Sequence, residues 1–119
     1  MPNHLPSRLT VAAVLLSAAY AVQAAGADLS KCAFPEAPTV PDGTSATEDE
    51  MGAAAAEVRA YVDATQAGLN CLGDLEASLG EDITDEQRQS IVASYNTHVD
   101  QLNATANAYN EAVRAFKAR

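Results

Sequence analysis

Residues 47–79 read TEDEMGAAAAEVRAYVDATQAGLNCLGDLEASL, and this stretch decides the fold. Apolar or small side chains recur every seventh residue, and a second set follows three residues later, which keeps one face of a helix apolar along its length. The two sets are Met51, Val58, Thr65, Leu72 and Leu79, and Ala54, Tyr61, Gly68 and Leu75. Thr47 with Glu50, or Ser45 with Glu48, matches the capping-box pattern that starts helices, and Gly80 is a typical C-cap. We therefore expect one helix over about 47–79.

A second amphipathic helix is predicted over about 84–117, starting from a capping box of Thr84 and Gln87. Its apolar stripe has the same sevenfold spacing and consists of Tyr95, Leu102, Tyr109 and Phe116, flanked by Ile91, Val92, Val99, Ala106, Ala112 and Val113. The connection between the helices is short, so they must pack as antiparallel neighbours. This topology would also bring three bases beside three acids, namely Arg114, Lys117 and Arg119 beside Glu48, Asp49 and Glu50.

Two glycines interrupt the first predicted helix, and each costs about 1 kcal/mol relative to alanine. Gly68 lies on the buried stripe and Gly73 lies near Cys71. We expect a close approach of another segment to compensate for both.

The segment before the helices, residues 25–46, is predicted to be an extended arm. Pro35, Pro38 and Pro41 are spaced by three, which is the repeat of a polyproline II helix, and Phe34 and Val40 are its apolar anchors. An extended chain rises about 3 Å per residue and a helix about 1.5 Å, so the arm can fold back along the first helix as far as Cys71. A free Pro-rich ligand for a groove-binding partner is the alternative.

The sequence has two cysteines, Cys32 and Cys71. An intramolecular disulfide is the simplest pairing and would tie the arm to the first helix, while an intermolecular bridge stays open.

Residues 1–24 match a secretory signal peptide. Arg8 provides the positive charge, residues 9–22 form the apolar segment, and Val22-Gln23-Ala24 is the cleavage site, with cleavage after Ala27 as the alternative. The apolar run is shorter than the roughly 20 residues that a membrane span needs. We therefore expect a periplasmic or secreted protein, in a compartment where disulfide bonds can form.

The formal net charge of the sequence is −9, and removal of residues 1–24 takes away one base and no acid, giving −10. This acidity argues against binding to nucleic acid or to anionic membranes. The sequence has no phosphate-binding glycine loop, no nucleophile elbow and no haem motif. We expect no enzymatic activity and no cofactor.

A small set of side chains, one on the first helix and the others on the second, is the candidate interaction surface. His98 is at the edge of the packed stripe, where a structural histidine beside a tyrosine or a backbone group is expected, because metal-ligating partners one turn away are missing. Asn96, Asn103 and Asn110 form a polar stripe that either is solvated, faces the arm or recognises a partner. Tyr61, Tyr95 and Tyr109 are expected to be core aromatics with hydroxyls at the edge. A ligand carrier would instead need a pocket between Tyr61, Tyr95 and His98.

Residues 83–89, ITDEQRQ, resemble the LTxxQ motif of small periplasmic stress chaperones. The match covers only these residues, Ile83 stands in place of the usual Leu, and a second copy of the motif is absent. The resemblance implies a helical, cradle-shaped dimer that binds unfolded client proteins without ATP.

The sequence therefore predicts an all-α protein in three parts: a signal peptide (1–24), a Pro-rich arm (25–46) and an antiparallel two-helix hairpin (47–119), with the arm tied to helix one by a disulfide. Its expected role is that of a non-enzymatic exported structural or interaction module, with a protein partner or a second copy of itself. A chaperone-like client binder is the alternative.

Overall fold

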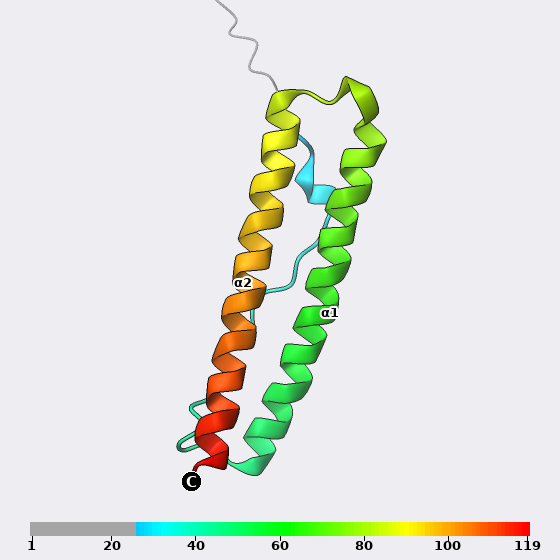
Figure 1. The fold of residues 1–119 in the computed structure, drawn as a ribbon. Coiled ribbons are helices and arrows are strands. Elements are labelled where there is room, and N and C mark those ends of the chain that lie inside the picture. The colour runs from blue at the N-terminus through cyan, green and yellow to red at the C-terminus, as the bar shows by residue number, and fades with distance from the viewer. Residues whose placement is uncertain (1–25) are drawn as a thin grey trace, which may run out of the picture.

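The computed structural model describes residues 26–119 and contains two long helices joined by a short turn (Figure 1). Helix α1 spans Glu48–Leu79 and helix α2 spans Asp85–Lys117, with the 3-10 turn η2 at Gly80–Asp82 between them. Another 3-10 turn, η1, spans Leu29–Lys31. Within the described part of the chain there is no strand, so the expected all-helical hairpin is confirmed. The predicted signal peptide, residues 1–24, lies outside the described residues.

Both helices begin at the capping boxes that the sequence predicts. The Thr47 hydroxyl accepts a hydrogen bond from the Glu50 amide at 3.1 Å, and the Glu50 carboxylate accepts one from the Thr47 amide at 2.8 Å. Thr84 and Gln87 form the same reciprocal pair at 3.1 and 2.9 Å. Gly80 ends α1 with φ of +61°, a backbone conformation that costs glycine little. The alternative start at Ser45 is not used.

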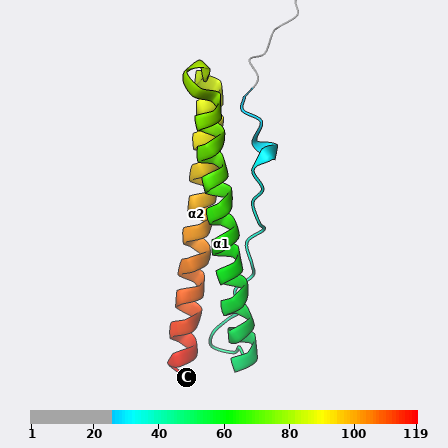
Figure 2. The same ribbon diagram turned by 90° about the vertical axis from the view of Figure 1, so that its right-hand side faces the viewer.

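The arm lies on one side of the hairpin and follows α1 in the opposite direction (Figure 2). Cys32 and Cys71 form an intramolecular disulfide with their Cα atoms 5.5 Å apart. At the other end of the arm, Ala46 packs beside Met51 near the start of α1. The predicted disulfide is therefore confirmed, and the chain from Cys32 to Ala46 runs along α1 from the level of Cys71 to the start of the helix.

The arm takes part in the core near both ends of the hairpin. Near the turn, Cys32 is buried with Leu72 and Ile91. Near the termini of the helices, Ala46 is buried with Met51 and Ala112. Because two helices alone can bury only the seam between them, the arm supplies the third side that such a small core needs.

The buried stripe of α2 differs from the predicted one. Its buried residues are Ile91, Thr105 and Ala112, whereas Tyr95 is 45% exposed. The other members of the predicted stripe, Leu102, Tyr109 and Phe116, are half-buried. The arm is the reason, because it packs against α2 on the side of Ala112 and draws the centre of the core toward itself. The prediction that Tyr95 is a core residue is wrong.

The C-terminal base Arg119 binds backbone rather than the acidic side chains expected for it. Its guanidinium donates hydrogen bonds to the carbonyl oxygens of Ala46 at 2.6 Å and Gly43 at 3.3 Å, and it lies 4.6 Å from the centre of the Phe116 ring. The end of α2 is thus fastened to the turn that leads from the arm into α1. None of the helices in residues 26–119 combines the length and apolar character needed to cross a membrane.

Candidate interaction surfaces

His98 of α2 contacts the arm two residues after Cys32. The Phe34 ring stacks on the imidazole with ring centroids 3.5 Å apart and planes inclined by 13°. The imidazole Nδ1 lies 2.7 Å from the Ser94 carbonyl oxygen, and since a carbonyl can only accept, Nδ1 carries the proton. The expected structural histidine beside a backbone group is present, and its aromatic partner is a phenylalanine of the arm.

Gly68 makes room for the same phenylalanine on α1. A Cβ atom at this position would lie 2.5 Å from Phe34 Cε1 and 2.8 Å from the Ala33 carbonyl oxygen. The predicted close approach at Gly68 is therefore confirmed. The same prediction for Gly73 is wrong, because a Cβ atom there would meet nothing within 4 Å.

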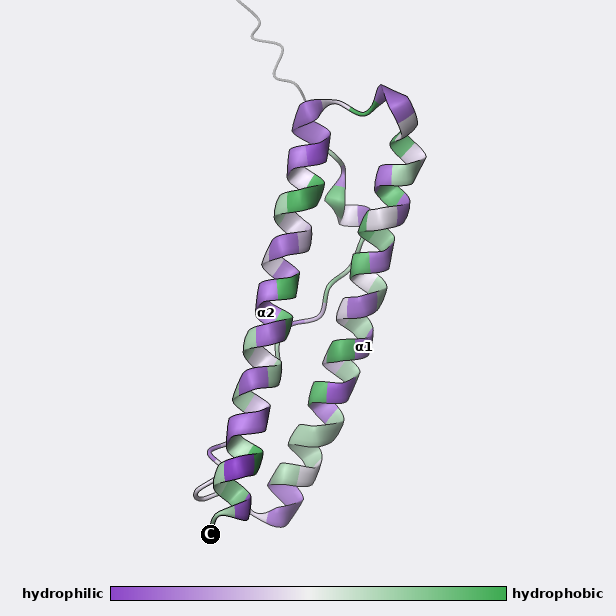
Figure 3. Ribbon diagram, viewed as in Figure 1, coloured by the Kyte–Doolittle hydropathy of each residue, from purple (hydrophilic) through white to green (hydrophobic). Residues whose placement is uncertain are grey.

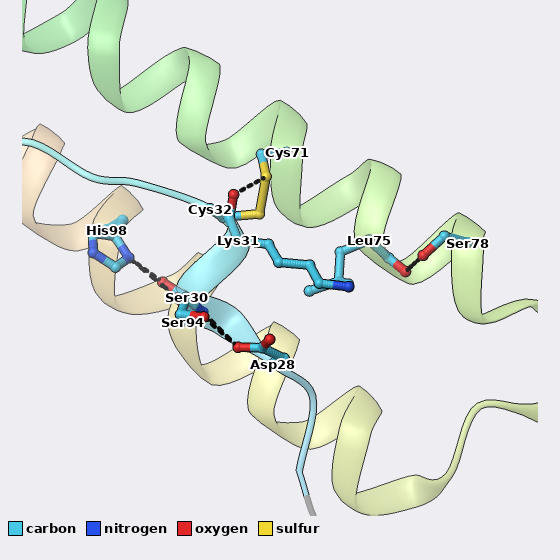
Figure 4. The surroundings of a disulfide bond; sticks show 9 residues. All are labelled: Asp28, Ser30, Lys31, Cys32, Cys71, Leu75, Ser78, Ser94 and His98. Atoms are coloured by element: carbon cyan, nitrogen blue, oxygen red, sulfur yellow. Dashed lines mark hydrogen bonds between the residues drawn. A yellow bond between two sulfur atoms is a disulfide. The ribbon is translucent and has the colours of Figure 1, made fainter.

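The disulfide lies where the arm emerges from η1 (Figure 4). Cys32 is buried and Cys71 is half-buried. At the start of η1, the Asp28 carboxylate accepts hydrogen bonds from the Ser30 hydroxyl and the Ser30 amide, and these bonds lower the pKa of Asp28. The bridge thus joins a locally capped turn to α1. A disulfide of this kind fits an oxidising compartment.

The tyrosines of the predicted interaction surface lie on different sides of the hairpin. Tyr61 is 4% exposed and, with Pro35 and Pro38, lines a shallow hollow on the arm side. His98 also faces the arm, whereas Tyr95 is exposed and lies beside Gly73 and Val92. The structure therefore does not bring Tyr61, Tyr95 and His98 together, and the pocket that a ligand carrier would need between them is not formed.

The side of the hairpin opposite the arm is left open, and we call it the uncovered face (Figure 3). Near the turn it contains a hollow of about 250 Å³ between the two helices. The hollow is lined by Leu72, Gly73, Glu76, Ile91, Val92 and Tyr95. Heptad spacing continues the stripe of Gly73 along α1 through Gln66, Arg59 and Gly52, and the stripes of Val92 and Tyr95 along α2 through Val99, Leu102, Ala106 and Tyr109.

The most exposed large apolar side chains of the described chain both lie on the uncovered face. Val92 is 47% exposed and Tyr95 is 45% exposed, and they are less than one helical turn apart. The four residues that continue these stripes, Val99, Leu102, Ala106 and Tyr109, are only half-buried. Local sequence patterns did not predict Val92 and Gly73 as surface features. Their heptad spacing indicates an exposed stripe only once the side covered by the arm is known.

The asparagine stripe runs along α2 beside the uncovered face. Asn96, Asn103 and Asn110 are all exposed. Asn96 lies next to Val92 in a shallow depression of the α2 surface. The arm contacts α2 at other positions, among them His98 and Ala112, so the alternative in which this stripe faces the arm is wrong.

The residues that resemble the chaperone motif have a local role in this structure. Thr84 and Gln87 are the reciprocal partners of the α2 capping box, and Ile83 packs against the core cluster near the turn. Helix initiation thus accounts for the motif without a client protein.

In the described part of the chain, His, Cys, Asp and Glu side chains do not gather into a group of three or more that could hold a metal ion. In comparisons with known proteins, no protein-family model, curated protein or solved structure matches the chain.

Proposed function

We propose that this protein is a non-enzymatic, exported interaction module that binds a protein partner through the uncovered face of its hairpin. The observation that carries the proposal is the pair Val92 and Tyr95, each exposed by nearly half beside an open hollow. Exposed apolar side chains that gather on one face, rather than lying scattered singly, are typical of an interaction site. The polar edge formed by Asn96, Asn103 and Asn110 fits the usual anatomy of an apolar interface centre with a polar rim.

Export to the periplasm or beyond is part of the proposal. Support comes from the signal-like residues 1–24 and from the Cys32–Cys71 disulfide, which would not persist in a reducing cytosol. Expression of the whole sequence in a Gram-negative host, followed by measurement of the intact mass, tests this part. We expect the oxidised chain to begin at Ala25 or Asp28, and full-length protein retained in the cytoplasm would contradict export.

The binding surface is tested by photocrosslinking in the same host. A benzophenone amino acid placed at Val92 should form a covalent protein adduct, because this side chain is exposed on the uncovered face. The matched control carries the same group at Asp100, which is exposed on the outer side of α2. Adducts at position 92 and not at position 100, with the partner identified by mass spectrometry, support the proposal. Equal or no adduct formation at the two positions overturns it.

The exposed apolar pair also supports a second candidate, a chaperone-like binder of unfolded proteins. In that case the purified protein should slow the aggregation of a chemically denatured model protein. The double variant Val92→Ser/Tyr95→Ser should lose this effect, while Ala93→Ser on the same helix should keep it. No suppression by the wild-type protein would exclude the chaperone role but leave binding to a folded partner intact.

A further inference from the structure

We propose that the partner of the uncovered face is a second copy of this chain, packed as an antiparallel four-helix bundle. This inference rests on the proposed function, because it names the occupant of the same surface. Two glycines first indicate a close neighbour. Gly52 and Gly73 lie on one stripe of α1, and a Cβ atom at either would meet nothing within 4 Å inside the chain. Each costs about 1 kcal/mol in a helix, and nothing in the single chain compensates.

The positions of these glycines define a two-fold axis. An axis perpendicular to α1 that passes between residues 62 and 63 would place Gly52 of one copy opposite Gly73 of the other, at both ends of the contact. The same axis pairs Arg59 with Gln66, a cation donor with an amide oxygen that can accept. Paired glycines allow the two α1 backbones to approach closely at the ends of this contact.

The same axis fits α2 without further adjustment. Leu72 packs with Ile91 near the turn, and Met51 packs with Ala112 three heptads further along both helices. The point between residues 62 and 63 is therefore level with the point between residues 100 and 101. The exposed and half-buried apolar residues of α2 lie at equal distances on either side of that point. The two-fold axis therefore places each of them opposite an apolar residue of the other copy. The pairs are Val92 with Tyr109, Tyr95 with Ala106, and Val99 with Leu102.

The area of the uncovered face is close to the area that each partner buries in a stable dimer interface. A helix of 32 residues is about 48 Å long, and a two-helix face about 15 Å wide then offers roughly 700 Å² per copy. Standard protein interfaces bury about 800 Å² per partner. The arm lies on the opposite side of the hairpin and leaves this surface free (Figure 2).

At the ends of α2, charge favours the antiparallel orientation over one with the two turns together. Residues 81–86 at the turn carry four acids, whereas Arg114 and Lys117 lie at the other end of α2. The proposed axis brings Lys117 of one copy beside Asp82 and Asp85 of the other, while turn-to-turn packing would put the acidic ends together. The net charge of −10 that remains without residues 1–24 still repels the copies as wholes, so added salt should favour the dimer.

The test is the mass of the oxidised, exported protein, measured by light scattering over a range of concentrations at low and high salt. We expect twice the chain mass, with a larger dimer fraction at high salt. Gly73→Leu should give a monomer that is at least as heat-stable as a wild-type monomer, because the added side chain has open space within its own chain. Ala67→Leu, on the exposed outer side of α1, is the matched control and should stay dimeric.

The register is tested by mixing two variants that each carry one added cysteine beside the Cys32–Cys71 bridge, Gly52→Cys and Gly73→Cys, in a glutathione buffer and mapping the new disulfide by peptide mass. A bridge between positions 52 and 73 of different copies, absent when either variant is alone, supports the proposed axis. A wild-type monomer at every concentration, or a dimer that Gly73→Leu leaves unchanged, overturns this inference. Photocrosslinking at position 92 to a different protein would then still support the proposed function.

Discussion

Phe34 of the arm stacks on His98 of α2 while its ring edge occupies the gap left by Gly68 on α1. One aromatic side chain thus joins all three segments of the fold, two residues after the disulfide-bonded Cys32. The imidazole is held in orientation by its Nδ1 hydrogen bond to the Ser94 carbonyl. This contact helps to hold the arm on the hairpin beside the disulfide.

Phe34→Ala should lower the free energy of unfolding by about 2 kcal/mol, because it removes a half-buried aromatic ring and its stacking contact with His98. Urea unfolding of the oxidised protein measures this. A double-mutant cycle with His98→Ala should give a coupling energy of about 1 kcal/mol. Thr39→Ala, at an exposed position of the same arm, should change stability little. A coupling energy near zero would show that the stacked rings do not stabilise the fold.

Gly68→Ala should destabilise the protein even though alanine favours helices, since the new methyl group would collide with the Phe34 ring and the Ala33 carbonyl. Gly52→Ala is the matched control when both variants are measured as monomers, at low protein concentration and low salt, because its methyl group meets nothing within its own chain and should raise helix stability by up to about 1 kcal/mol. Thermal unfolding of the two variants should therefore shift in opposite directions. Two upward shifts would mean that the arm yields easily at Gly68.

The helices and the bridged arm could be predicted from the sequence, but the side of the hairpin on which the arm lies could not. Heptad spacing and capping boxes are local patterns, so they predicted both helices and their ends. Cysteine chemistry and chain length predicted the bridged arm. The side of the seam on which the arm lies depends on contacts between distant segments, such as Phe34 with His98, and no local pattern encodes it. For that reason Tyr95 was expected in the core, although it lies on the surface that we propose for binding.

Thr65 is the one described residue with a buried side-chain polar atom that has no hydrogen-bond partner. The residue is 1% exposed, and its Oγ1 lies between the helices without a donor or acceptor. Thr65→Val keeps the shape and removes the unpaired hydroxyl, so it should stabilise the fold by about 1 kcal/mol. Thr97→Val, at an exposed position of α2, is the control and should have little effect. Loss of stability in Thr65→Val would reveal a hydrogen bond to the hydroxyl in solution.

The turn between the arm and α1 should respond to acid through Asp42. Its carboxylate accepts hydrogen bonds from the Thr44 hydroxyl at 2.7 Å and the Thr44 amide at 2.9 Å, and these lower the pKa of Asp42 below its ordinary value of 3.8. Because the pKa of Asp42 is lower in the folded state than in the unfolded state, these hydrogen bonds stabilise the turn at pH values above the unfolded-state pKa. This stabilisation is lost as the pH falls through the folded-state pKa. The Asp42 carboxyl resonance and the Thr44 amide shift should therefore titrate together, with a midpoint below 3.8. In Thr44→Val, which lacks the hydroxyl donor, the midpoint should rise, and an unchanged midpoint would contradict the assignment.

The Cys32–Cys71 bridge should be the largest single contribution to stability that can be removed without touching the helix–helix seam. It closes a loop with a sequence separation of 39, for which the chain-entropy model gives about 4 kcal/mol. We expect the double variant Cys32→Ala/Cys71→Ala to lose most of this free energy of unfolding in urea, and the wild-type protein to lose a similar amount when a dithiol reduces it. Hydrogen exchange locates the loss: amides of α1 near Leu72 should lose more protection than those near Met51, because the arm is released first at the bridged end. Equal loss along the whole of α1 would mean that the arm and the hairpin unfold as one unit.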